Sequence, residues 1–178
     1  QEIPQKEIIR RDGAVSLVIN KKGEILALQR EDKKTEYLFP QGGIESGEDP
    51  LISAIREVRE ESGYVNVSLI SELGVHENYF EMKESTRHRI TYTYLFNLNS
   101  DENHGLDLDE GEVSFIAHWM TPKEALEKIN TRNHKLFLEL FINHNKRVFT
   151  EKGILVNSGS FNDMTSEEAR KAITEFVG

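Results

Sequence analysis

Three glutamates on one short segment are the residues of this chain best placed to do chemistry. Glu57, Glu60 and Glu61 fall in a stretch with helical character, and at about 100° per residue they share one side of a helix. Like charges at this spacing repel by about 0.2–0.5 kcal/mol per pair. A divalent cation would relieve that repulsion, and Mg²⁺ and Mn²⁺ prefer carboxylate oxygens. The glutamate cluster therefore has two interpretations. It is either a solvated acidic face, or a metal site whose cation binds phosphate oxygens and activates water.

The elements around the glutamates are suited to position them. A glycine-rich loop, residues 42–47, directly precedes the segment and permits close backbone approach. We predict a helix over residues 49–62, because Asp49 can cap it, Pro50 suits its first turn and Gly63 suits its C-terminal end. The apolar residues expected to anchor the opposite side on a sheet are Leu51, Ile55 and Val58.

The spacing of these residues is a specific motif. It reads Gly, five residues, Glu, seven residues, then Arg-Glu-apolar-x-Glu-Glu-x-Gly-apolar. Its positions are occupied by Gly42, Glu48, Arg56, Glu57, Val58, Glu60, Glu61, Gly63 and Tyr64. On these residues the chain resembles the Nudix hydrolases, although Tyr64 stands where that family usually has an aliphatic residue. The stretch FIAHWMTPKEAL also resembles the family's usual ending, so the resemblance covers about residues 11–145.

The resemblance implies both a fold and an activity. The implied fold is α/β, an α/β/α sandwich with a mixed β-sheet. The implied reaction is hydrolysis of a pyrophosphate bond in a nucleoside di- or polyphosphate derivative. The implied metal ligands, for Mg²⁺ or Mn²⁺, are Glu57, Glu60, Glu61 and Gly42, and the three glutamates would be catalytic. The implied structural residues of the box are Gly42, Glu48, Arg56 and Gly63, with Glu48 and Arg56 bracing the loop against the helix.

The substrate is less constrained. Residues 38–48, LFPQGGIESGE, resemble the same stretch of diadenosine polyphosphate hydrolases and RNA pyrophosphohydrolases, which suggests a polyphosphate. The residues expected to contact phosphates are Arg30, Lys33 and Lys34, unless they form a solvated basic turn. Tyr79 and Phe80 can stack on a base or belong to the core. The general base is Glu61, Glu110 or Glu112, a choice that the sequence leaves open.

Hydrophobic patterning predicts the other elements. Strands are expected at 13–20 and 23–30, joined as a hairpin, and at 64–73, 89–99 and 113–120, with a short apolar stretch at 36–43. Residues 100–112 form a polar loop. Helices are expected at 121–129, opened by a Thr121–Glu124 capping box, and at 134–145.

The ends of the chain have a different character. Residues 149–176 resemble the closing part of the editing domain of bacterial leucyl-tRNA synthetases, and residues 3–9 resemble a short strand of it. We therefore expect a Nudix domain at 11–146, flanked by editing-domain-like segments at 1–10 and 147–178 that form a strand-helix stump. The first residue is Gln, which fits a fragment of a longer protein, a leucine-tRNA ligase. The alternative function is then a non-catalytic insertion that positions tRNA or the editing domain.

Composition bounds the remaining possibilities. The net charge of -9 argues against broad, non-specific nucleic-acid binding. The chain has no cysteine, which excludes disulfides and thiolate metal sites and fits a cytoplasmic location. No apolar run approaches the roughly 18 residues of a membrane span, so no membrane association is expected. Dimerisation through strands stays open.

Overall fold

The computed structural model describes residues 6–106 and 108–131. The helix expected at 134–145, and the segment 147–178, lie outside this part of the chain. The elements, in chain order, are β1 (Glu7–Arg10), β2 (Gly13–Ile19), β3 (Ile25–Arg30), β4 (Tyr37–Leu38), β5 (Gln41–Gly43), α1 (Pro50–Ser62), β6 (Val67–Glu81), β7 (Ser85–Leu98), β8 (Phe115–Met120) and α2 (Pro122–Lys128). Neither helix among the described residues is long and apolar enough to cross a membrane.

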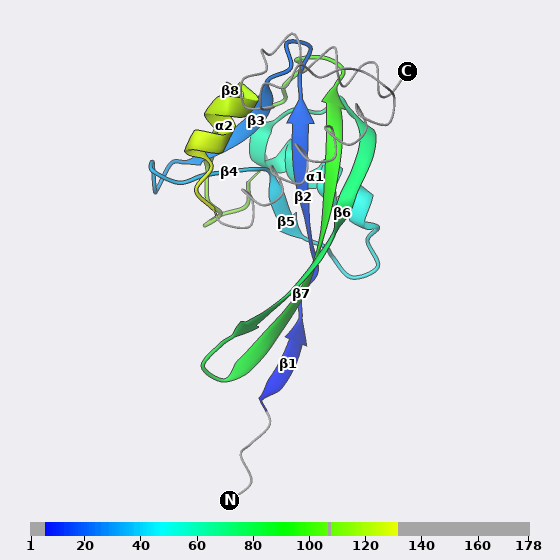
Figure 1. Cartoon of the computed structure of the whole chain (residues 1–178), viewed down its shortest axis with the longest axis vertical. Helices are drawn as coiled ribbons and strands as arrows, with labels where there is room; N and C mark the ends of the chain where they lie inside the picture. The colour runs from blue at the N-terminus through cyan, green and yellow to red at the C-terminus, as the bar shows by residue number, and fades with distance from the viewer. Residues whose placement is uncertain (1–5, 107, 132–178) are drawn as a thin grey trace, which may run out of the picture.

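All of these strands belong to one mixed sheet, as predicted. β2 lies at its centre, parallel to β7 on one side and antiparallel to β3 and β5. β6 extends the sheet antiparallel to β7, and β8 pairs antiparallel with β3. The parallel pairing of β2 with β7 brings together segments far apart in the sequence (Figure 1).

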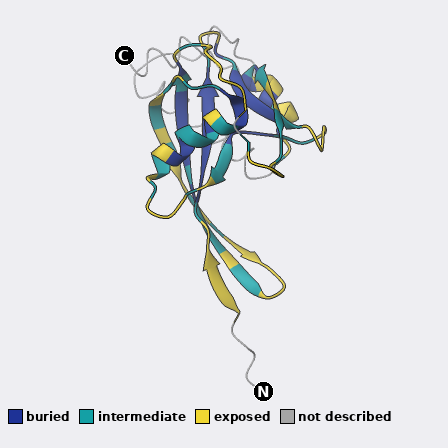
Figure 2. Cartoon of the chain, turned by 180° about the vertical axis from the view of Figure 1, so that it is seen from behind, coloured by how far each residue is buried: buried dark blue, intermediate teal, exposed yellow. Residues whose placement is uncertain are grey.

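Two apolar cores, one on each face of the sheet, confirm the α/β/α sandwich. Because side chains alternate along a strand, β2 contributes Ala14 and Val18 to the face covered by α1, where they pack with Val58. Its intervening residues Val15, Leu17 and Ile19 face the other side with Ala125 of α2. β2 is buried along its whole length for this reason, and Figure 2 shows the buried strands behind α1.

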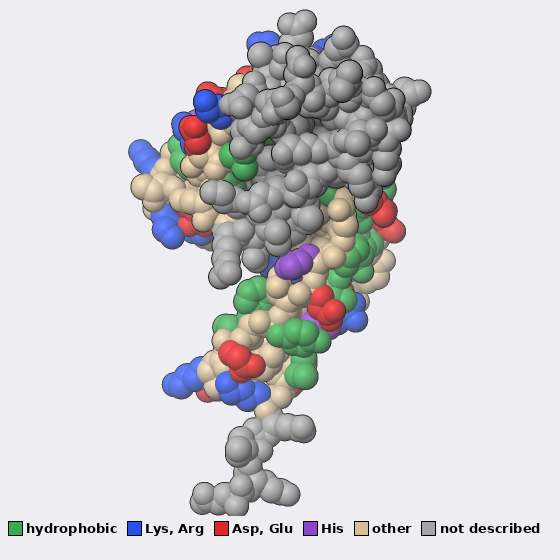
Figure 3. Space-filling view, viewed as in Figure 1, with side chains coloured by type: hydrophobic (Ala, Val, Ile, Leu, Met, Phe, Trp, Pro, Cys, Tyr) green, Lys and Arg blue, Asp and Glu red, His purple; other side chains and the backbone are tan. Residues whose placement is uncertain are grey.

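β6 and β7 are longer than predicted and project from the body as a twisted arm (Figure 1). β1 completes the arm by pairing in parallel with β7, from Glu7 opposite Ser85 to Arg10 opposite His88. The expected ends of these strands, at residues 73 and 89, were wrong because the arm has no core to give it an apolar pattern. Cross-strand contacts hold it, among them Tyr79 stacked on His88 with 4.5 Å between ring centroids. Apolar side chains lie exposed along the arm (Figure 3).

The predicted capping of both helices is confirmed. The Asp49 side chain accepts a hydrogen bond from the Leu51 N–H at 2.8 Å, and Pro50 opens α1. Gly63 ends α1 in the left-handed conformation, with φ of 80°, and its N–H donates to the carbonyl of Arg59. The reciprocal Thr121–Glu124 box opens α2.

Gly63 is needed for a second reason, which predicts a measurable cost of substitution. A Cβ at this position would lie 2.2 Å from Oδ1 of Asn103, the residue whose side chain donates to the last-turn carbonyl of Ser62. We expect Gly63→Ala to lower the free energy of unfolding by about 3 kcal/mol, from left-handed strain plus the clash. Gly111→Ala is the matched control, because Gly111 also has a positive φ (87°) but nothing lies within 4 Å of its Cβ position. Equal losses in the two variants, measured by urea unfolding, would contradict the steric argument.

Candidate active site

Arg56 is the centre of an ionic network that ties the glycine-rich loop to α1. Its Nε donates to Glu48 at 2.9 Å, and its Nη1 donates to Glu57 at 2.7 Å and to Glu60 at 3.0 Å. Its Nη2 donates to the second Glu48 oxygen and to the backbone carbonyl of Gly43, both at 3.1 Å. One guanidinium thereby compensates three of the four carboxylates of the motif and fixes the loop against the helix.

The network has a direct effect on protonation. Hydrogen bonding to Arg56 lowers the pKa of Glu48 to about 2, helped by the N–H of Glu45, which donates to the same carboxylate. The Glu48 hydrogen bond in turn raises the pKa of Arg56, with the charges of Glu57 and Glu60 adding to it. Glu48 and Arg56 are therefore fully charged and paired at neutral pH.

Glu61 is the carboxyl that Arg56 does not reach. It is buried, with 6% of its surface exposed, and its Oε1 accepts the backbone N–H of Gln41 at 3.1 Å. Within the described part of the chain, its Oε2 has no hydrogen-bond partner. Burial, and then the negative charge of Glu57, raise the pKa of Glu61 well above its usual value. Burial also raises the pKa of Glu57, although Arg56 opposes that shift. Both carboxyls of the pair therefore keep a proton more readily than an isolated glutamate does.

Gly42 brings the loop backbone onto this carboxyl pair. β5 pairs with β2 so that Gly42 lies opposite Ala14. A Cβ on Gly42 would lie 1.9 Å from the carboxyl carbon of Glu57. Any larger residue would therefore displace Glu57, which explains why glycine is required here.

The chemistry of these donors suits a divalent cation. Glu57 and Glu61 are adjacent carboxyls with raised pKa values, and one Glu61 oxygen has no hydrogen-bond partner among the described residues. Replacing a proton on such a pair with a metal ion would stabilise it. Among residues 6–106 and 108–131, no three acidic or histidine side chains are arranged so that they could hold a metal ion, and Glu57 and Glu60 are hydrogen-bonded to Arg56 instead. A cation bound here would compete with Arg56 for those two carboxylates.

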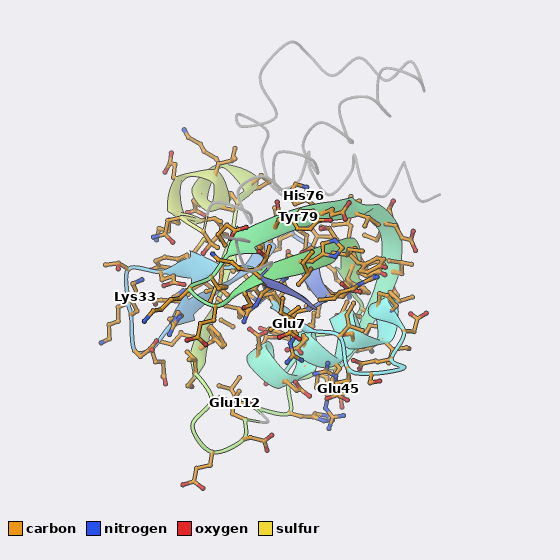
Figure 4. The ribbon with its side chains drawn as sticks, turned by 90° about the horizontal axis from the view of Figure 1, so that it is seen from below. Glu7, Lys33, Glu45, His76, Tyr79 and Glu112 are labelled. Carbon is orange, nitrogen blue, oxygen red and sulfur yellow. The ribbon has the colours of Figure 1, made fainter. Side chains whose placement is uncertain are left out.

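A cleft of about 780 Å³ lies along the glycine-rich loop. One wall is the loop from Gln41 to Glu48, and the other comes from the β1–β2 connection and from β7. Four arginines line it, namely Arg10, Arg11, Arg87 and Arg89. Glu45 projects from the loop on this side of the molecule (Figure 4).

The residues expected from the sequence to contact substrate do not line this cleft. Arg30 pairs with Asp32 and Glu36, and Lys33, which pairs with Glu36, lies far from Glu45 in Figure 4. The others outside the lining are Lys34, Tyr79, Phe80, Glu110 and Glu112. Of the predicted motif residues, Gly42 and Glu48 line the cleft, whereas the α1 glutamates Glu57, Glu60 and Glu61 do not. Tyr79 lies on the arm, and Glu112 accepts the Asp109 N–H at 2.9 Å within its own loop.

The four arginines were missed in the sequence. The signal that identifies two of them is the alternation Arg87-His88-Arg89, which places both guanidinium groups on one face of a strand. It becomes visible only when β7 is known to begin at Ser85.

Comparison with known proteins decides the family. The model described as the NUDIX domain matches residues 9–141. The chain belongs to the Nudix family. The methanol dehydrogenase activator of Bacillus methanolicus is 38% identical over 135 residues, which cover 72% of this chain and 68% of that protein. An RNA pyrophosphohydrolase of Rhodospirillum rubrum is 40% identical over 62 residues, covering 35% of this chain. The chain spans only 38% of the length of that relative, and 40% of the one from Pelagibacter ubique.

Solved structures support the fold of this Nudix domain. An Ap4A hydrolase from C. elegans superimposes with a TM-score of 0.55 and 20% identity, over 78% of this chain and 98% of that one. A Nudix hydrolase from Nitrosomonas europaea gives 0.57 and 18% identity, over 76% and 90%. The shared feature is the mixed sheet with few helices.

The Arg56 network predicts a large stability loss when it is removed. We expect Arg56→Gln to lower the free energy of unfolding by about 2–3 kcal/mol, because Glu48, Glu57 and Glu60 all lose their charged partner. Arg59→Gln is the matched control on the same helix, since Arg59 is exposed and should change stability by less than about 0.5 kcal/mol. Chemical denaturation of both variants checks this, and comparable losses would contradict a special role for Arg56.

The raised pKa of Glu61 predicts a pH-dependent gain in stability on substitution. In the folded state Glu61 keeps its proton to a higher pH than in the unfolded chain, which releases it at about pH 4.3. The free energy of unfolding of the parent therefore falls as the pH rises above that value. It stops falling once the pH exceeds the pKa of Glu61 in the folded state. Glu61→Gln does not titrate, so without metal it should be more stable than the parent by roughly 1–3 kcal/mol at about pH 8. The gain should vanish near pH 4. Urea unfolding with chelator across this range measures it, and a constant difference would contradict the shifted pKa.

Proposed function

We propose that this Nudix domain is a hydrolase, dependent on Mg²⁺ or Mn²⁺, that cleaves a pyrophosphate bond in a nucleoside di- or polyphosphate. The observation that carries the proposal is the Glu57–Glu61 carboxyl pair beside Gly42, in which Glu61 is buried and the pKa of both carboxyls is raised. A binding module gains nothing from such a pair, which costs folding free energy as long as no cation replaces the proton.

The residues of the chain have distinct roles in this proposal. Glu57, Glu60 and Glu61, with the carbonyl of Gly42, would hold the cation. When bound, the cation would neutralise charge on the phosphates and lower the pKa of water. Arg56 and Glu48 keep the loop in place against α1. None of the three candidates for the base lines the cleft, and we favour Glu61 because it lies beside Glu57 and accepts the N–H of Gln41, a residue of the cleft lining. Water would attack phosphorus, its proton would pass to Glu61, and the P–O bond to the leaving phosphate would break.

The names of several relatives favour a polyphosphate among the possible substrates. They include RNA pyrophosphohydrolases and an Ap4A hydrolase, and residues 38–48 resemble those classes. A third structural neighbour, the Nudix domain of NrtR from Shewanella oneidensis, was solved with ADP ribose. Hydrolysis assays must therefore include both polyphosphates and diphosphate-linked sugars.

The second candidate is a non-catalytic insertion in a leucyl-tRNA synthetase, which would position tRNA or the editing domain. It depends on residues 149–176, which lie outside the described part of the chain, and on residues 3–9. Within that short stretch, β1 begins at Glu7 and pairs with the arm of β7. This parentage, tRNA contact, dimerisation and a cytoplasmic location stay predictions.

Activity on a substrate panel distinguishes the two candidates. The parent should release phosphate from at least one of ATP, Ap4A, ADP-ribose or a 5′-triphosphorylated oligoribonucleotide with Mg²⁺ or Mn²⁺, and lose this activity with chelator. Glu60→Gln should lower kcat/KM by about 100-fold or more, since a metal ligand is worth several kcal/mol in the transition state. Glu127→Gln, an exposed glutamate of α2, is the matched control and should be unaffected. Folding is checked by circular dichroism, and equal activity of Glu60→Gln and the parent would refute the enzyme assignment.

A further inference from the structure

Three arginines that form no ion pair with any residue of 6–106 or 108–131 line the cleft beside the glycine-rich loop. Arg87 and Arg89 alternate along β7 and so lie on one face of it. The N–H of Arg11 donates to the carbonyl of His88 between them at 2.8 Å, which brings the β1–β2 connection alongside. All three residues contribute to the wall of the cleft.

The electrostatic situation of these arginines differs from that of the others around the cleft. Arg10 is paired with Asp12 at 2.9 Å, and Arg56 is paired with Glu48. No side-chain hydrogen bond or ion pair to a described residue engages the guanidinium groups of Arg11, Arg87 or Arg89. Arg89 is half-buried, and its burial, followed by the charge of Arg87, lowers its pKa. A guanidinium that is desolvated next to a like charge gains strongly from an anion.

The position of Arg89 connects this surface to the carboxyl pair. A Cβ on Gly13 would lie 2.4 Å from Nη2 of Arg89 and 3.0 Å from the carbonyl oxygen of Gly42. The guanidinium therefore rests on the backbone of Gly13, beside the first residue of the motif. Gly42 in turn abuts the carboxyl of Glu57. Arg89 and Glu57 thus both lie next to Gly42.

The charges of the cleft leave an excess of positive groups. Of its acidic residues, Asp12 is neutralised by Arg10 and Glu48 by Arg56. Glu45 is the remaining carboxylate of the lining, against three arginines. Guanidinium groups bind phosphate oxygens through paired N–H donors, and glycines such as Gly43 and Gly47 let a ligand approach the opposite wall closely.

We infer that Arg89, Arg87 and Arg11 form a phosphate-binding subsite that holds the phosphates beyond the scissile bond. The chain of phosphates would run from the carboxyl pair, past Gly42, toward the arm. The ligand class is a nucleoside 5′-polyphosphate with three or more phosphates, either free or at the end of an RNA. This use of the subsite in catalysis rests on the proposed function, whereas anion binding by the arginines does not.

Binding of inorganic tripolyphosphate tests the subsite without catalysis. Calorimetry with chelator present should detect binding to the parent and a Kd raised at least about tenfold by Arg89→Ala, the loss expected when charged hydrogen bonds are removed. Arg87→Ala, at an exposed position that cannot compromise the fold, should raise the Kd about threefold or more. Lys21→Ala, in the β2–β3 turn outside the cleft lining, is the control and should bind as the parent does.

The outcomes separate the subsite from the proposed function. Failure of the parent to bind tripolyphosphate, or parent-like binding by Arg87→Ala and Arg89→Ala, overturns the subsite even if the enzyme is active. Arginine-dependent binding in a protein without hydrolytic activity supports the subsite and refutes the enzyme. Should Arg89→Ala fail to fold in a thermal scan, Arg87→Ala alone decides.

Competition experiments identify the source of the phosphates. ATP and a 5′-triphosphorylated oligoribonucleotide should each displace tripolyphosphate better than ADP-ribose does, and the stronger competitor of the two is the better match to the site. ADP-ribose displacing tripolyphosphate as well as both triphosphates would overturn the inferred class.

Discussion

The balance between one arginine and four glutamates is the constraint on which the rest of the site depends. Arg56 can donate hydrogen bonds to Glu48, Glu57 and Glu60 because its guanidinium N–H groups reach both the loop and its own helix. Glu61 lies beyond that reach, buried under β5 and held by the N–H of Gln41. Glu48, Glu57 and Glu60 are therefore paired with Arg56, whereas the charge of Glu61 is not compensated by an arginine. The salt bridges of Arg56 hold the loop in place, and in the proposed function Glu61 would join Glu57 and Glu60 in binding the cation.

The sheet supplies the precision that this arrangement requires. Pairing of β5 with β2 sets Gly42 over Glu57, while the same strand β2 carries Gly13 under Arg89. Because β2 is buried on both faces, it cannot shift by one residue without exchanging its two apolar cores. The register of the central strand therefore fixes the separation of Gly42, which abuts Glu57, from Gly13, on which Arg89 rests.

Local sequence predicted the helix and its glutamates well, since the capping residues Asp49 and Gly63 and the apolar spacing all agree on α1. It did not single out the arginines that line the cleft. Lys33 and Arg30 form a conspicuous basic turn, yet nearby Asp32 and Glu36 neutralise it. Arg87 and Arg89 precede the apolar alternation of β7, which begins at Ile90, so their placement beside the cleft depends on long-range pairing that no local pattern encodes.

The parallel partnership of β2 and β7 has a consequence for how the chain folds. Strand β2 is made early, but its partner, which ends near Asn97, emerges only after β3, α1 and β6. The β6–β7 hairpin can close locally, whereas docking β2 against it must overcome the closure entropy of a long loop. Until then the backbone groups of β2 that will pair with β7 have no partner strand, and its apolar side chains are less well covered. A nascent chain interrupted before β7 would expose that edge of β2, which could then pair with a strand of another chain.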